Sequence, residues 1–240
     1  MERKIEFAPE EFYHLYNRGN NKLPIFNDKS DYMRFILLLY LSNHTDSEKV
    51  TTLFDQGLSV SDIFKKYSKN NDVLVNIGAY CLMPNHFHIL VREIKGSGMS
   101  KMMQKLLTAY SMYFNRKNER TGGLFESRFK ATHVDSDEYL KYLYSYIHLN
   151  PVKLIDPMWK ESGIKDKIKS KGHLDSYPYS SYLDYRGTKR EEGAILNISS
   201  FPEYFSKPAD FDDFIGDWLS FKEFGALPRS DLGSRSDLGK

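Results

Sequence analysis

Apolar and polar residues alternate along the first 150 positions in two patterns, one typical of strands and one of helices. Short runs rich in β-branched and aromatic residues, bounded by turn-forming residues, predict strands at about 12–16, 73–82, 86–93 and 129–134. Apolar spacings of three and four, with N-cap residues at Asp28 and Ser136, predict helices at about 31–41, 100–117 and 136–149. Pro151 ends the last of these helices.

The predicted order is strand, helix, hairpin, helix, strand, helix. This order favours an α+β fold of the ferredoxin-like (RRM-like) kind, an antiparallel sheet with helices packed on one face. We expect this domain to span residues 1–153, with the polar stretch 44–71 as a loop insertion that has one helical part near 60–67. Residues 154–227 form a C-terminal extension of unclear role. Residues 228–240 repeat Ser-Asp-Leu-Gly, and we expect them to be disordered.

Composition narrows the class of protein. Hydrophobic residues make up 40% of the chain, enough for a core, and the net charge of +2 favours no particular partner. The single cysteine, Cys81, excludes an intrachain disulfide and fits a reducing cytoplasm. The start of the chain lacks the apolar core of a signal peptide, and the most apolar run, 35–41, is too short to span a bilayer. We therefore expect a soluble cytoplasmic protein without a membrane partner.

A pair of histidines is the strongest candidate for chemistry. His86 and His88 fall two apart in a predicted strand, so their side chains project from the same face. Two adjacent imidazoles can hold one divalent ion. Two ordinary surface histidines would give the same pattern, and this pair alone does not decide between the readings.

A second candidate set lies on the predicted helix that follows Ser136. Tyr139, Tyr142, Tyr146 and Asn150 are spaced by three and four, on one helix face. A tyrosine hydroxyl can attack phosphorus when a cation neutralises the phosphate, and an amide oxygen can be a metal ligand. Tyrosines at this spacing are more often half-buried core residues.

The segment 101–130 combines positive charge with aromatic side chains. It carries seven basic residues against two glutamates, with five tyrosine and phenylalanine residues interleaved. Such a surface can bind phosphates and stack on unpaired bases, although a solvated basic helix face would look the same. The candidate DNA-binding residues are Lys101, Lys105, Arg116, Lys117, Arg128 and Lys130.

Taken together, these motifs resemble the REP-associated tyrosine transposases, in the single-tyrosine branch of the histidine-hydrophobe-histidine (HUH) nucleases. The resemblance spans roughly residues 12–153. The matching segments, in chain order, are 17–21 (Asn-Arg-Gly-Asn-Asn), 83–91 (with Pro-Asn-His-Phe-His), 123–130 (Gly-Leu-Phe-Glu-Ser-Arg-Phe-Lys), 146–152 (Tyr-Ile-His-Leu-Asn-Pro-Val) and 177–182 (Tyr-Pro-Tyr-Ser-Ser-Tyr).

The resemblance implies a site and an activity. His86, His88 and Asn150 would bind Mg²⁺ or Mn²⁺, and Tyr146 would be the nucleophile. The implied function is cleavage and strand transfer at single-stranded or hairpin DNA through a 5′-phosphotyrosine, that is, DNA transposition and recombination. The chain departs from related transposases in three respects: asparagine at 150 where glutamine is usual, the long stretch 44–71, and His148 where an acidic residue is common.

Two other functions fit the same residues. The chain could be a catalytically inactive single-stranded nucleic-acid-binding module derived from a transposase, because a ferredoxin-like sheet with aromatic residues can bind single strands. It could also be a metal phosphodiesterase in which water replaces Tyr146 as the nucleophile. The sequence leaves the oligomeric state open between monomer and homodimer.

Overall fold

The structure is a computed structural model that describes residues 6–68 and 72–220. The chain start and the predicted disordered segment 228–240 therefore lie outside the described residues. Among those residues, four strands form one antiparallel sheet in the order β2-β3-β1-β4, as in ferredoxin-like folds. The strands are β1 (Phe12–Arg18), β2 (Val75–Met83), β3 (His86–Glu93) and β4 (Lys130–Val134).

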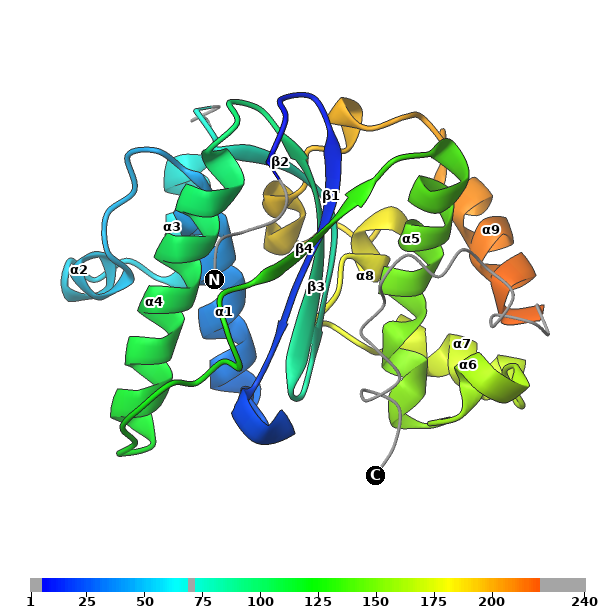
Figure 1. Cartoon of the computed structure of the whole chain (residues 1–240), viewed down its shortest axis with the longest axis horizontal. Coiled ribbons are helices and arrows are strands. Elements are labelled where there is room, and N and C mark those ends of the chain that lie inside the picture. The colour runs from blue at the N-terminus through cyan, green and yellow to red at the C-terminus, as the bar shows by residue number, and fades with distance from the viewer. Residues whose placement is uncertain (1–5, 69–71, 221–240) are drawn as a thin grey trace.

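Helices cover both faces of the sheet. Figure 1 shows the sheet nearly edge-on, with α1 (Lys29–Asn43) and α4 (Gly98–Lys117) on one side and α5 (Asp137–Leu149) on the other. The predicted ferredoxin-like α+β fold is confirmed, but the prediction that the helices share one face is wrong: α1 and α4 share a face, and α5 lies on the opposite one. The opposite face is also covered, by α5 and the C-terminal extension. In the described part of the chain, no helix is both long and apolar enough to cross a membrane.

Strand alternation divides the interior into two cores. Tyr13 and Leu15 of β1 pack into the core shared with α1 and α4. His14, between them, projects to the α5 side, where its ring contacts that of Tyr146. Because both faces of the sheet are buried, a polar side chain on the α5 side must find a partner inside the protein.

The segment 44–71 is more than a loop. It contains α2 (Val50–Asp55) and α3 (Val60–Tyr67), and α3 begins with a capping box between Ser59 and Asp62. Its apolar side chains join the core formed with α1 and α4, and the buried ones are Val50, Leu53, Ile63, Phe64 and Tyr67. The sequence pattern predicted only the second of these helices and missed this packing.

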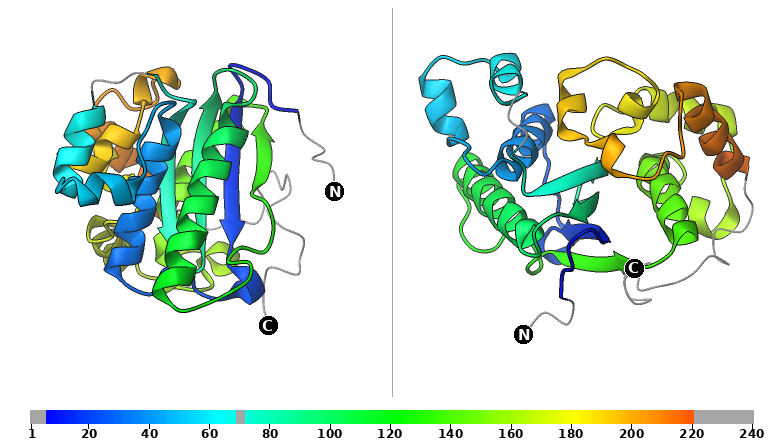
Figure 2. Two further views of the ribbon diagram at one scale, coloured as in Figure 1. Left: turned by 90° about the vertical axis from the view of Figure 1, so that its left-hand side faces the viewer. Right: turned by 90° about the horizontal axis from the view of Figure 1, so that it is seen from above.

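The C-terminal extension covers the α5 side of the sheet and one sheet edge. Leu82 of β2 donates its N–H to the Tyr179 carbonyl, and Ser181 donates its N–H to the Tyr80 carbonyl, both at 2.9 Å. Phe201 lies over Gly78, where any Cβ would be 2.7 Å from its ring. The elements of this region are η2 (Asn150–Leu154), α6 (Trp159–Ser162), α7 (Lys167–Asp175), α8 (Tyr182–Tyr185), η3 (Glu191–Ile195), η4 (Ile198–Ser200) and α9 (Pro208–Ser220). Figure 2 shows α9 beside α5. By contrast, η3 packs against α1 and α3, where Ile195 joins the core on that side of the sheet.

Candidate active site

The two motif histidines begin β3 on the face toward α5. His88 lies opposite Tyr16 in the sheet register, and His86 lies opposite Arg18. The centroids of the two imidazole rings are 5.1 Å apart. His88 is buried and His86 is partly exposed. The two side chains therefore share one face, as the alternation predicted.

Helix α5 brings the tyrosine and the asparagine to these histidines. The ring centroid of Tyr146 is 5.2 Å from that of His88, and the side chain of Asn150 hydrogen-bonds to His86. Asn150 also donates from Nδ2 to the Tyr146 carbonyl at 3.2 Å, which leaves its Oδ1 directed away from the helix. The four residues of the predicted site thus meet in the fold, although His86 and Tyr146 are 60 residues apart in the sequence.

The donor set fits a divalent metal. In residues 6–68 and 72–220, no cluster of three or more His, Cys, Asp or Glu side chains could hold an ion. The third donor beside the two imidazoles is the Asn150 amide, which already lies within hydrogen-bonding distance of His86. Two imidazoles and one amide oxygen suit Mn²⁺ or Mg²⁺ and leave positions open for substrate oxygens.

Burial keeps these imidazoles uncharged. It lowers the pKa of His86 to about 3, helped by the positive charges of Arg18 and Lys160. It also lowers the pKa of His88 far below the ordinary value, with His14 and His86 as further causes. Metal binding requires neutral histidine, so the site is in the protonation state that a ligand needs at neutral pH.

The extension contributes a cation that the sequence did not reveal. Lys160 of α6 places its Nζ 4.1 Å from the centroid of the Tyr146 ring. Lys153 is half-buried nearby, and burial followed by the charge of Lys160 lowers its pKa. Neither residue belongs to a motif, because their proximity to Tyr146 depends on how the chain turns after Pro151.

The candidate DNA-binding residues do not form one surface. Lys101, Lys105, Arg116 and Lys117 belong to α4, across the sheet from the histidines. Lys101 and Arg116 are exposed. Lys105 donates from Nζ to the His44 carbonyl at 2.7 Å, so it holds the end of α1 in place.

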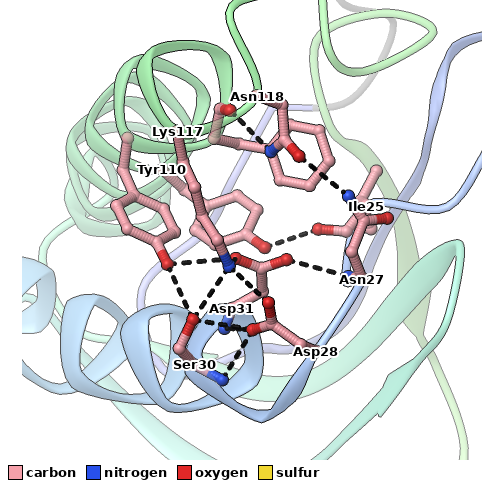
Figure 3. Close-up of polar contacts among 10 residues, drawn as sticks. Ile25, Asn27, Asp28, Ser30, Asp31, Tyr110, Lys117 and Asn118 are labelled. Carbon is pink, nitrogen blue, oxygen red and sulfur yellow. Dashed lines mark hydrogen bonds and ion pairs between the residues drawn. The ribbon is translucent and has the colours of Figure 1, made fainter.

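Lys117 is held inside a polar cluster (Figure 3). Its Nζ lies 2.6 Å from Oδ1 of the buried Asp31 and 2.7 Å from Oδ2 of Asp28. Burial opposes the charge of Lys117, but these two hydrogen bonds outweigh it and raise its pKa. Lys117 therefore fixes α4 to the start of α1, which leaves it poorly placed to bind a phosphate.

Arg128 and Lys130 lie near the β4 edge of the sheet. Lys130 places its Nζ 5.9 Å from the ring centroid of Tyr16, on the same sheet face as His88. Arg128 lines a groove of about 910 Å³ between α4 and the segment that leads into β4. Phe125 and Phe129 line the same groove, as the pairing of basic and aromatic residues in the sequence suggested.

His148 makes its hydrogen bonds outside the candidate site. Its Nδ1 lies 2.9 Å from the Tyr144 carbonyl and its Nε2 2.8 Å from Oγ of Ser181. The side chain is fully buried, and burial lowers its pKa to about 3. The role that the sequence left open is structural: His148 ties α5 to the extension.

Comparison with known protein families found a match over the central part of the chain. Residues 48–150 match the family model described as "Transposase IS200 like". Over this segment, less than half of the chain, the sequence is similar to the IS200-like transposases. The recognition of a tyrosine-transposase relationship from the sequence is thereby confirmed. The match includes His86, His88, Tyr146 and Asn150, and stops before Lys153 and Lys160.

A solved structure is similar to this chain over most of its length. That structure is a REP-associated tyrosine transposase bound to a REP hairpin, with 12% sequence identity and a TM-score of 0.43. The similarity covers 86% of this chain and 99% of the other. The comparison with curated proteins found no match.

Proposed function

We propose that this chain is a metal-dependent DNA transposase that cuts one strand of DNA with Tyr146 as its nucleophile. The observation that carries the proposal is the convergence of Tyr146, Asn150, His86 and His88 at one place in the fold. The family match supports the reaction class. The proposed cofactor is Mn²⁺ or Mg²⁺, held by His86, His88 and Asn150.

In the proposed reaction, Tyr146 Oη bonds to the scissile phosphorus. The bond from phosphorus to the upstream O3′ breaks, and O3′ leaves with the electron pair and takes up a proton. The products are a free 3′-hydroxyl and a 5′-phosphotyrosine. A bound metal would supply Lewis-acid polarisation of the phosphate oxygens. Attack by another strand's 3′-hydroxyl on the phosphotyrosine joins the strands and restores Tyr146, so no nucleotide cofactor is consumed.

The cations around Tyr146 suit this chemistry. Lys160 and Lys153 flank the tyrosine from the extension, and Arg18 adds charge beside His86. Positive groups fixed near a reacting phosphate stabilise the charge that develops in the transition state. The groove lined by Phe125, Phe129 and Arg128 supports a single-stranded or hairpin substrate, because unpaired bases can stack on aromatic rings.

One observation favours the alternative of a DNA-binding module without cleavage. Tyr146 is only 6% exposed and Asn150 only 1% exposed, so a phosphodiester has little access in this conformation. An enzyme must open this site when DNA binds, whereas a binding module need not.

The direct test is cleavage of a labelled hairpin oligonucleotide in Mn²⁺. A tyrosine nucleophile transfers the downstream fragment to the protein, so a 3′-end label must migrate with denatured protein and a 5′-end label must not. A water nucleophile would release both labels from the protein. Tight binding without any cut in Mn²⁺ or Mg²⁺ would support the binding module.

A further inference from the structure

His14 occupies the centre of the site, although no motif includes it. It lies on β1, 1% exposed, with its Nε2 2.8 Å from Nδ1 of His88. Its own Nδ1 is buried without a hydrogen-bond partner in the described part of the chain. The polar contact of this buried ring is therefore directed at His88.

The other motif histidine has a comparable partner on its outer nitrogen. Nδ1 of His86 lies 2.7 Å from Oδ1 of Asn85. Asn85 donates from Nδ2 to the Lys22 carbonyl at 3.0 Å, which fixes the amide so that its oxygen faces His86. A neutral His86 therefore carries its proton on Nδ1 and keeps a lone pair on Nε2.

We infer that His14 is a positioning residue that accepts a hydrogen bond from Nδ1–H of His88 and so keeps Nε2 of His88 available to the metal. The inference rests on the proposed function, because it takes His88 to be a metal ligand. Residues that bind the second nitrogen of a metal-ligating histidine fix its tautomer and the orientation of its ring. Asn85 would serve His86 as His14 serves His88.

The chemistry of a neutral imidazole pair explains why an acceptor is needed here. Each ring carries one proton, and a proton on Nε2 of His88 would occupy the nitrogen that the ion requires. With its proton on Nδ1, His88 donates to His14. Either ring can donate in this hydrogen bond, and the neutral His14 that accepts it carries its own proton on the unpartnered Nδ1. A metal on Nε2 of His88 would fix the His88 proton on Nδ1, and without His14 that buried N–H would lack a partner, at a cost of about 1–3 kcal/mol.

The test compares variants of His14 that separate the effect of its hydrogen-bond acceptor from the effect of its ring. His14→Phe keeps a ring of similar size and removes the acceptor, whereas His14→Gln keeps an acceptor oxygen. His133→Ala is the matched control, since His133 lies on β4 and is bonded to Glu11. Mn²⁺ affinity is measured by calorimetry, and ¹H–¹⁵N spectra of the imidazoles without metal report which nitrogen of His88 is protonated.

We expect His14→Phe to weaken Mn²⁺ binding roughly 10- to 100-fold, the usual effect of losing such a partner. His14→Gln should recover most of that loss, and His133→Ala should bind like the parent. Parental affinity in a folded His14→Phe variant, or a failure of glutamine to rescue, would overturn the inference. Changing both His86 and His88 to alanine separates the two proposals: if Mn²⁺ affinity survives that change, the metal site itself is wrong.

Discussion

A positive charge close to the candidate nucleophile comes from Lys160. Its ammonium group lies over the face of the Tyr146 ring, where the charge would stabilise an incoming phosphate in the proposed reaction. The sequence predicted Tyr146 from its helix spacing and from a motif, but Lys160 belongs to no pattern. Residues that reach the site from outside any motif can be identified only when the fold is known, and the buried His14 is a second example.

Lys160→Met should lower the rate of cleavage at least 10-fold while Mn²⁺ affinity stays within a few-fold of the parent. The change removes the charge near the phosphate but touches none of the proposed metal ligands. Lys169→Met, an exposed lysine on α7, is the control and should cleave normally. Unchanged cleavage by Lys160→Met would mean that this charge takes no part in the reaction.

His148 makes the stability of the fold depend on pH. Its pKa is about 3 in the folded protein and near 6.5 in an unfolded chain, so only the unfolded state takes up the proton at mildly acidic pH. Its contribution to stability is complete above pH 6.5 and declines as the pH falls toward 3. The loss from pH 7.5 to pH 5 should be about 2 kcal/mol from this residue.

Urea unfolding of the parent and of His148→Gln isolates this contribution. Glutamine can still donate to the Tyr144 carbonyl but does not titrate. The variant should lose about 2 kcal/mol less than the parent between pH 7.5 and pH 5, because other titrating groups act equally in both proteins. Parallel pH profiles would show that His148 is not kept neutral by the fold.

At the level of elements, the site depends on where β3 begins and where α5 ends. His86 is the first residue of β3 after the Pro84–Asn85 turn, and Asn150 directly follows α5. The sheet register and the packing of α5 on its face set how these ends meet. Helices α2 and α3 lie on the other side of the sheet, so they affect the stability of the fold more directly than the chemistry.

Phe64→Ala in α3 should lower the free energy of unfolding by roughly 3–5 kcal/mol, since Phe64 is 3% exposed within the core. Lys65→Ala, on the exposed surface of the same helix, should change it by less than about 0.5 kcal/mol. Chemical denaturation measures both. For the same reason, we expect that replacing 44–71 with a short link destabilises the fold. A link variant with parental stability would show that this stretch is dispensable.

Local sequence rules predicted most of the central domain. Alternation and helical spacing act over a few residues, so β3 and α3 have the predicted bounds and α5 ends at Leu149, before Pro151. The rules failed where distant segments meet. The short α2 and the packing of Tyr177–Tyr182 along β2 depend on partners far along the chain. The same limit applies to the candidate site. Local motifs predicted His86, His88, Tyr146 and Asn150, but no local pattern pointed to His14 or Lys160.

Across the whole molecule, the sheet separates two sets of basic residues. Arg18, Lys130, Lys153 and Lys160 lie on the side of Tyr146, whereas most of the basic residues of 101–130 lie on the side of α4. Arg128 stands at the groove near the β4 edge, between the two sides. A single DNA strand that runs from this groove to Tyr146 must therefore pass the β4 edge of the sheet.

Arg128→Ala should weaken binding of a single-stranded or hairpin oligonucleotide and reduce the slope of log affinity against log salt by about 1. Lys117→Ala should leave that slope unchanged and instead lower stability by roughly 1–3 kcal/mol, because the buried Asp31 loses its cation. Fluorescence anisotropy at several salt concentrations tests the first expectation and urea unfolding the second. An equal loss of salt slope in both variants would contradict this division of roles.

The most direct test of the central claim is the comparison of Tyr146→Phe with Tyr142→Phe. Both tyrosines are buried on α5, and each change removes one oxygen and preserves the ring. Burial raises the pKa of Tyr142, so its hydroxyl is a poor source of nucleophile. In Mn²⁺ with a 3′-labelled hairpin, Tyr146→Phe should bind DNA and metal but form neither product nor covalent adduct, and Tyr142→Phe should keep at least part of its cleavage. Cleavage by Tyr146→Phe at the parental rate would contradict the account.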